Sequence, residues 1–338
     1  MLRPASLVLP LGLSATGPAH ADSSTYEGDF EPTSPAQVTE FCATHTGVSG
    51  DLRIGPGWGA TDLSPLGCVA HIGGSLVLDR APMLETTRGL TGLAPETVVA
   101  RTVIKGNPSL TELGPGLPRT RDLVIAENTI LQTVDALPRA VSGGRYVVTA
   151  NPELQRFEGP EARSGTRLAG VSFAGNPRLQ AVTGFRGVDE VEGLSLTGND
   201  ALTTLEGPRI RRAGAVTVAD APVEDLPLLD RLQVAQSLTL HGLPRLPAVP
   251  ELYELSRIGR LYIDGCRALG SVDGLAANRS QRPVLDAAVL RGNRVLPSDH
   301  AEQILAMLAR GTDPGKVVVI ANGPRAGDLD PGVPGGRR

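Results

Sequence analysis

Two adjacent pairs of carboxylates are the residues of this sequence best suited to acid–base chemistry: Asp189 with Glu190, and Glu224 with Asp225. Enzymes that hydrolyse polysaccharides place two carboxyl groups about 5–10 Å apart. Each pair, however, is expected in a solvated turn, and neither is matched by acids one repeat further along the chain. A polysaccharide lyase or hydrolase is therefore the alternative interpretation, and we assign no catalytic residue.

Metal ligands and activated nucleophiles are equally sparse. No nucleophile motif, phosphate-binding loop or dinucleotide-binding fingerprint occurs. The histidines after residue 21 lack the spacing of a metal site; they are His45, His71, His241 and His300. The sequence thus predicts no metal site and no cofactor, and a protein that is not an enzyme.

Three cysteines remain as reactive groups. Cys42 and Cys68 lie about one repeat apart, so in an oxidising compartment they can form a disulfide. A loop of that size adds stability on the order of 3 kcal/mol. Cys266 is left over, and its position in the repeat predicts a small buried thiol rather than a reactive or metal-binding one.

The first residues resemble a secretory signal. Arg3 supplies a positive charge, residues 7–13 are mostly apolar, and Ala19-His20-Ala21 is a small-x-small cleavage pattern. A disordered N-terminus is the other interpretation. We expect a signal peptide over residues 1–21 and a protein that is secreted, periplasmic or at the cell surface. No run of 18 apolar residues offers a membrane span, so no membrane insertion is expected.

The composition limits the partners and the kind of core. The formal net charge of −4 gives no general attraction to nucleic acid. Aromatic residues make up only 3% of the chain, so the core must consist largely of aliphatic side chains. The 41 glycines and 28 prolines have no collagen-like period, which favours many turns between many short elements.

A repeat of about 23 residues runs through nearly the whole chain and marks a solenoid. Its pattern is Leu-x-Ile/Leu-x-x-Asn-x-x-Leu, as in residues 123–131 and 194–202. The apolar pair forms a short strand whose alternate side chains point inward, and the Asn turns the chain and can pair with neighbouring backbone. The expected ladder comprises Asn107, Asn128, Asn151, Asn176, Asn199 and Asn293, with Cys266 in the same column.

The fold class predicted from this pattern is mainly β: a right-handed parallel β-solenoid with a short capping helix at each end. A solenoid of about 11–12 coils is expected over residues 34–323, between a disordered linker at 22–33 and a disordered tail at 324–338. Ser34-Pro35-Ala36-Gln37 is a capping box that starts the first helix. Ser298 or Asp299 should cap the second, over residues 300–310, and residues 316–320 form a closing strand.

The opening coils resemble a known family. Cys42, the segment Val48-Ser-Gly-Asp-Leu-Arg-Ile54 and the segment Ile72-Gly-Gly-Ser-Leu-Val-Leu78 are similar to the start of a receptor L-domain. This leucine-rich-repeat-like β-helix occurs in receptor ectodomains and in secreted bacterial proteins. The resemblance implies fold and a binding role but no signalling, because an L-domain has about half as many coils and the flanking Cys-rich modules are missing.

The residue between the two inward positions of each strand should face outward, and it is Val in four consecutive copies. An apolar stripe with a charged edge often marks a partner site, although β-branched residues also simply suit strands. We expect this face to bind a protein or peptide, or a second copy of itself. A carbohydrate is less favoured because few aromatics could stack on sugars. The expected ligand-binding residues are Arg53, Val77, Arg101, Val103, Val124, Arg145, Val147 and Tyr262.

Overall fold

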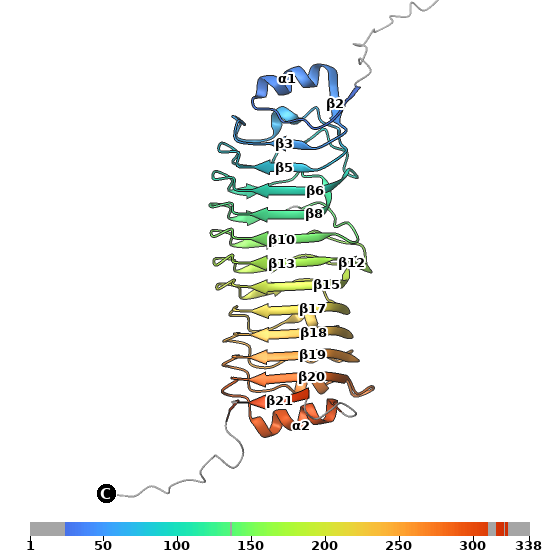
Figure 1. The fold of residues 1–338 in the computed structure, drawn as a ribbon, viewed down its shortest axis with the longest axis vertical. Coiled ribbons are helices and arrows are strands. Elements are labelled where there is room, and N and C mark those ends of the chain that lie inside the picture. Colours follow the sequence, from blue (N-terminus) through green and yellow to red (C-terminus); the bar gives the residue numbers. More distant parts are fainter. Residues whose placement is uncertain (1–23, 136, 310–315, 321, 324–338) are drawn as a thin grey trace, which may run out of the picture.

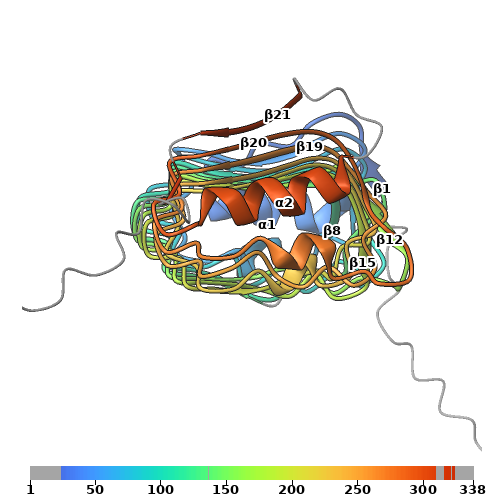
Figure 2. The ribbon, with the colours of Figure 1, turned by 90° about the horizontal axis from the view of Figure 1, so that it is seen from below.

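Each repeat forms one coil of a right-handed parallel β-solenoid, which confirms the predicted fold class (Figures 1 and 2). The structure is a computed structural model that describes residues 24–135, 137–309, 316–320 and 322–323. The expected signal peptide at 1–21 and the tail at 324–338 lie outside the described residues. No helix within the described ranges is both long and apolar enough to cross a bilayer.

One long sheet extends from end to end and carries the pattern that the repeat predicts. Its strands pair in parallel, each with the corresponding strand of the next coil. In order they are β3 (Leu52–Ile54), β5 (Leu76–Asp79), β6 (Val98–Lys105), β8 (Arg119–Ala126), β10 (Arg145–Thr149), β13 (Gly170–Ala174), β15 (Val188–Thr197), β17 (Arg212–Ala219), β18 (Val234–His241), β19 (Arg257–Asp264), β20 (Val284–Arg291) and β21 (Val317–Ile320), with β12 (Thr166–Leu168) pairing β15 to the side.

The remainder of each coil is too short for a long helix and forms small elements instead. A five-stranded parallel sheet comprises β7 (Glu112–Leu113), β9 (Thr133–Val134), β11 (Arg156–Glu158), β14 (Ala181–Thr183) and β16 (Thr204–Glu206). A three-stranded sheet comprises β1 (Ser24–Tyr26), β2 (His45–Val48) and β4 (His71–Ile72). Among the fully described segments, three 3₁₀ helices contribute to the coils: η1 (Ser64–Leu66), η2 (Pro227–Leu229) and η3 (Asp273–Ala276).

The core is a continuous column of aliphatic side chains inside the coils. The inward residues of the strands are almost completely buried, for example Leu76 and Leu78 on β5. Aromatic rings enter this column near its middle, where Phe157 lies 4.8 Å from Phe173 and 6.1 Å from Phe185. Because no single coil can enclose such side chains, the coils stabilise one another by stacking.

A ladder of fully buried asparagines follows the strands of the long sheet. The side-chain oxygen of Asn151 accepts from the backbone N–H of Asn128 at 3.1 Å, and its amide donates to the carbonyl of Ile125 at 3.1 Å. The same bonds recur from Asn107 to Asn199. Ala221 and Leu243 interrupt the ladder, which resumes at Cys266 and Asn293 and ends at Asn322, a member that the repeat analysis did not include.

Directly before each position of the ladder column from Ala81 to Asn293 the backbone enters the left-handed region. Glycine holds this position in most coils, including Gly175 with φ 63° and Gly198 with φ 62°. Arg80, Glu127 and Ala150 adopt the same conformation although they carry a Cβ, with φ between 52° and 57°. A left-handed residue costs a non-glycine roughly 1–2 kcal/mol, so the ladder bonds and strand pairing must outweigh this cost in those coils.

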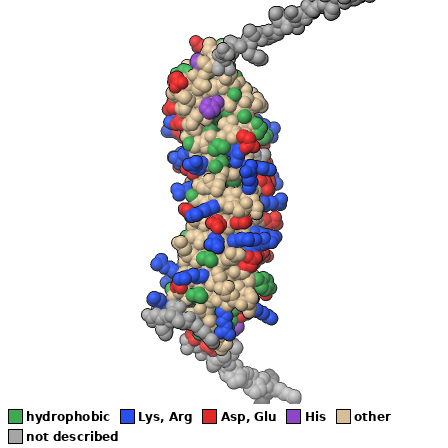
Figure 3. All heavy atoms as spheres, turned by 90° about the vertical axis from the view of Figure 1, so that its right-hand side faces the viewer, with side chains coloured by type: hydrophobic (Ala, Val, Ile, Leu, Met, Phe, Trp, Pro, Cys, Tyr) green, Lys and Arg blue, Asp and Glu red, His purple; other side chains and the backbone are tan. Residues whose placement is uncertain are grey.

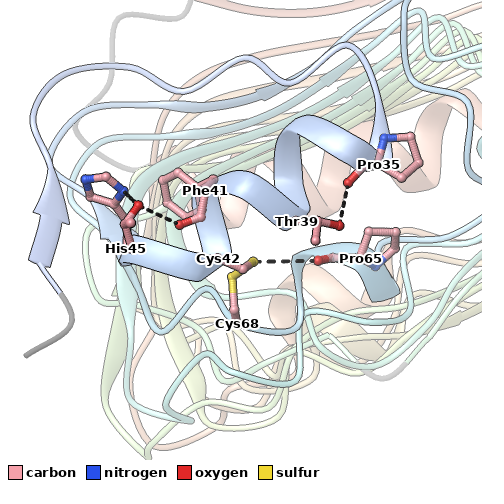
Figure 4. Close-up of a disulfide and its surroundings, with 8 residues drawn as sticks. Pro35, Thr39, Phe41, Cys42, His45, Pro65 and Cys68 are labelled. Atoms are coloured by element: carbon pink, nitrogen blue, oxygen red, sulfur yellow. Dashed lines mark hydrogen bonds between the residues drawn. A yellow bond between two sulfur atoms is a disulfide. The ribbon is translucent and has the colours of Figure 1, made fainter. Parts of the chain in front are cut away.

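The N-terminal cap is helix α1 (Pro35–Thr44), which lies across the first coil (Figure 1). Ser34 is its N-cap, accepting from the backbone N–H of Gln37 at 3.4 Å. The predicted disulfide between Cys42 and Cys68 is confirmed, and it ties the helix to the segment after η1 (Figure 4). The opposite cap is helix α2 (Ser298–Leu308), with Ile304, Leu305 and Leu308 buried against the last coil.

Two expectations about the ends are wrong. Residues 24–33 are not a disordered linker: β1 pairs with β2, and Phe30 bridges Leu52 and stacks on Phe41 at 4.2 Å between ring centroids. Residues 24–33 pack on β3, the first edge strand of the long sheet, and this packing explains why they are ordered. Helix α2 is preceded by Pro297 rather than capped by Ser298 or Asp299, because the Ser298 hydroxyl donates to the carbonyl of Gly323 at 3.1 Å.

Replacing one ladder residue should destabilise the whole stack. We predict that Asn151→Ala lowers the free energy of unfolding by about 2–4 kcal/mol, because the carbonyls of Ile125 and Thr149 and the N–H of Asn128 lose their partner in a dry interior. Urea unfolding followed by circular dichroism measures this change. Cys266→Ala, which removes only weak thiol contacts at 3.7 and 3.8 Å, should cost less; an equal loss would contradict the ladder's role.

One inward position of the long sheet carries a hydroxyl without a partner. Thr102 on β6 lies between Leu76 and Leu123, and its Oγ1 has no hydrogen-bond partner among the described residues. We predict that Thr102→Val raises the free energy of unfolding by about 1 kcal/mol, since the buried hydroxyl is removed with little change of shape.

The matched control is Thr120→Val on the neighbouring strand β8. Thr120 is also buried, but its hydroxyl donates to the carbonyl of Asp122 at 2.8 Å, so this change should lower stability. Urea unfolding of both variants measures whether each change raises or lowers the free energy of unfolding. If both changes stabilise the protein, the missing partner at Thr102 is not the cause.

Candidate functional site

The residues predicted to face outward form one column along the outer face of the long sheet. Val77 lies opposite Val103, Val103 opposite Val124, and Val124 opposite Val147, each in the register of the strand pairs. All four are half-buried, because each is flanked by its neighbours in the column. With strands about 4.8 Å apart, they make an apolar ridge roughly 14 Å long.

Charged residues border this valine ridge on the side where the strands begin. Arg101 lies opposite Asp122, and Asp122 lies opposite Arg145. Within the described part of the chain these three side chains form no ion pair with one another or with other groups. Their charges are therefore available to groups brought by a partner.

Two of the expected ligand-binding residues differ from the rest: Arg53 adjoins the ridge opposite Val77, and Tyr262 lies apart from it. Arg53 occupies the same column at the first coil, but it is held by the carboxylates of Asp51 at 2.5 Å and Asp29 at 3.6 Å. Tyr262 lies on β19, five strand positions beyond β10 and so about 24 Å away. The predicted set therefore divides into a continuous ridge that Arg53 extends at its first coil and one separate residue, Tyr262.

Small side chains separate the ridge from Tyr262. Strands β13 and β15 present Gly170, Ser172, Gly193 and Ser195 outward, and a shallow depression of about 280 Å³ lies over them. Arg145 and Val147 also line this depression, so the last coil of the ridge borders it directly.

Tyr262 belongs to a polar cluster on β18, β19 and β20. Its hydroxyl donates to the carboxylate of Asp264 at 2.9 Å, and the guanidinium of Arg291 donates to the same carboxylate at 3.0 Å while lying 5.6 Å from the ring centroid. Nδ1 of His241 lies 3.4 Å from this carboxylate. The cluster is an ordered surface network centred on Asp264, whose side chain is only 14% exposed.

The environment of Asp264 determines how the cluster titrates. Burial acts to raise the pKa of Asp264, but the hydrogen bonds from Arg291 and Tyr262 and the nearby positive charges outweigh it and hold the pKa below its ordinary value. Burial and the hydrogen bond to Asp264 raise the pKa of Tyr262. At neutral pH the carboxylate is therefore ionised and the phenol is protonated.

One of the two candidate acid pairs lies where it was expected, and the other does not. Asp189 and Glu190 lie in strand β15, not in a turn, while Glu224 and Asp225 lie in a loop. Asp189 lines a groove of about 700 Å³ together with two acids of the five-stranded sheet, Glu158 and Glu206, and with arginines of the adjoining loops, among them Arg209. Since Glu158 and Glu206 both lie opposite Thr183, their backbones are about 9.5 Å apart.

Neither metal ligands nor similarity to known proteins assigns a function to these residues. Across the described ranges no three His, Cys, Asp or Glu side chains are placed to hold a metal ion. A scan against protein-family models and a search of curated proteins found no match to this chain.

The sequence did not single out the cluster around Tyr262, although its signal was present. His241, Asp264 and Arg291 follow the outward residue by two positions in three successive repeats, and the register places them side by side. Aligning this second outward column would have brought them together. The contacts between them required the structure.

The network predicts a stability that depends on pH. Because the pKa of Asp264 is lowered in the folded protein, its ionised form contributes stability above the ordinary carboxyl pKa, and this contribution is lost as pH falls through the lowered value. We predict that Asp264→Asn lowers the free energy of unfolding by about 1 kcal/mol at pH 7 and that the difference shrinks below pH 4.

Denaturant unfolding at a series of pH values measures this difference. Asp220→Asn serves as the control, since Asp220 is more exposed and lies 4.0 Å from His241, so its loss should have little effect. A difference for Asp264→Asn that stays constant down to pH 2 would contradict the assignment.

Proposed function

We propose that the protein is an exported, non-catalytic binding protein that uses the valine ridge of its long sheet to hold a protein or peptide. The observation that carries this proposal is the register of Val77, Val103, Val124 and Val147 beside three charges without ion partners. Interfaces combine an apolar centre with a polar border in this way. The resemblance to receptor L-domains in the first coils supports the same role.

The charges specify the kind of partner. A segment lying across the strands would cover the valines with apolar side chains and meet Arg101, Asp122 and Arg145 in turn. It should therefore carry acidic groups opposite the two arginines and a basic group opposite the aspartate. A second copy of the chain could also pair its own ridge in this way, provided that the symmetry placed Asp122 against an arginine.

The compartment is part of the proposal. The Cys42–Cys68 disulfide is consistent with an oxidising environment outside the cytoplasm. Together with the signal-like first residues, it supports export to the periplasm, the cell surface or the medium.

The ridge can be tested with changes that keep strand propensity. The triple variant Val103→Thr, Val124→Thr and Val147→Thr adopts the residue type found at Thr217 and Thr239 in the same column, so the fold should persist. Peptides selected on the wild-type protein from a displayed random library should lose at least tenfold in affinity for this variant. Fluorescence anisotropy with the selected peptides measures the change.

Val289→Thr is the matched control, because Val289 lies in the same column but beyond Tyr262, far from the ridge. It should bind the selected peptides as the wild type does. If the triple variant keeps full affinity, or if the control loses as much, the ridge is not the binding site. Analytical ultracentrifugation of the same proteins tests self-association through the ridge.

The alternative function, an enzyme acting on polysaccharide, would have to use the groove around Asp189. Several acids, among them Glu158 and Glu206, and several arginines line this groove. If the protein degrades a polysaccharide and the Glu206→Gln variant loses that activity, the enzyme interpretation replaces the binding proposal.

A further inference from the structure

A second groove, of about 740 Å³, lies at the corner where β18, β19 and β20 begin. Figure 3 views the solenoid from the side on which the strands start, where basic and acidic side chains project along its length. Near the C-terminal end this corner contributes Arg257, Arg260 and Lys316 to the groove, with Asp286 as the acid among its lining residues. The groove therefore carries a net positive charge of about two in a chain whose net charge is −4.

The shape of the groove follows from a bend in each strand. Two consecutive residues, such as Gly259 and Arg260 on β19, face away from the core before the strand continues with the buried Leu261. A Cβ at Gly259 would lie 2.5 Å from the carbonyl oxygen of Gln236 in the preceding coil, so only glycine fits there. The absence of a side chain at Gly259 leaves backbone at the floor of the groove.

Arg260 and Lys316 place positive charges at two points on the wall of the groove. Arg260 lies opposite Ala287 on β20, and on the other side of β20 Ala288 lies opposite Val317, the residue that follows Lys316. The backbones of Arg260 and Lys316 therefore flank β20 roughly two strand spacings, about 9.5 Å, apart, and both side chains line the groove. Neither forms an ion pair with a described residue.

The third cation of the groove, Arg257, forms an ion pair with Asp286. The guanidinium of Arg257 donates to the carboxylate of Asp286 at 2.6 Å, and both groups remain partly exposed at 58% and 43%. This pair orients Arg257 along the groove. Ser237, opposite Arg260 on β18, adds a neutral hydroxyl to the same wall.

We propose that this corner groove binds an acidic polysaccharide through its carboxylate groups, with Arg260 and Lys316 on either side of one carboxylate and Arg257 near the next. Arginine matches carboxylates with two parallel hydrogen bonds, and the hydroxyls of a sugar ring can pair with Ser237, Gln236 and the exposed backbone at Gly259. The volume suits a few linked sugar units rather than the flat contact of a protein.

Other polyanions fit the groove less well. Single-stranded nucleic acid is commonly bound by stacking its bases on aromatic side chains, and none lines the groove, whereas an acidic sugar can be held by its carboxylate and hydroxyl groups without stacking. A membrane surface would require a flat basic face rather than a concave one.

The proposal is tested with the full chain and short oligomers of galacturonic acid, measured by isothermal titration calorimetry in low salt. Binding is expected for the galacturonate oligomers and not for neutral galactose oligomers of equal length. Arg260→Gln and Lys316→Gln should each weaken binding at least tenfold, and the double variant should abolish it. Added salt should weaken binding of the wild type.

Arg294→Gln is the matched control, because it removes an exposed positive charge from the turn after β20, away from the groove. It should bind within twofold of the wild type. An equal loss in Arg294→Gln, or equal binding of the neutral oligomers, would overturn the proposal. So would tighter binding of pyrophosphate or single-stranded DNA than of galacturonate, or no binding of galacturonate at all. The triple valine variant should bind galacturonate normally, which keeps this test separate from that of the ridge.

Discussion

Every other property of this molecule depends on one constraint: each coil must place its strand directly opposite the strand of the next. The backbone donors and acceptors of a coil point along the stack, so only a neighbour in register can satisfy them. The buried asparagines reinforce this register, because each amide reaches both the preceding strand and the adjacent ladder residue. A slip by one residue would leave these groups unpaired and turn the leucines outward.

The same register produces the surface. Side chains at one position of the repeat become neighbours about 4.8 Å apart on the outer face, although they are some 23 residues apart in sequence. The valine ridge and the cluster around Asp264 are two instances of this rule. Their chemistry differs because the repeat fixes the inward residues and leaves the outward ones free to vary.

The repeat made the fold, the disulfide and the outward column predictable, because strand alternation and the ladder are local consequences of residue type. Features that depend on how one segment of the chain packs over another could not be predicted from the repeat. Phe30 is ordered because it packs on α1 and closes the first edge of the sheet. Asp189 lies in a strand because β15 extends past the usual starting point to pair with β12. The corner groove depends on the steric requirement at Gly259, which an isolated glycine in a sequence does not reveal.

Successive ladder residues are separated by 21 to 29 residues, yet the strands that precede them stay in register. The surplus residues are absorbed in the loops and short elements of each coil. Insertions of a few residues therefore alter the outline of a coil without moving the long face, whereas a whole duplicated coil lengthens it by one strand spacing. The outward positions of the long face repeat every strand spacing of about 4.8 Å. The number of coils therefore sets the length of extended ligand that the face can cover, and a single substitution changes the side chain presented at one position without changing the others.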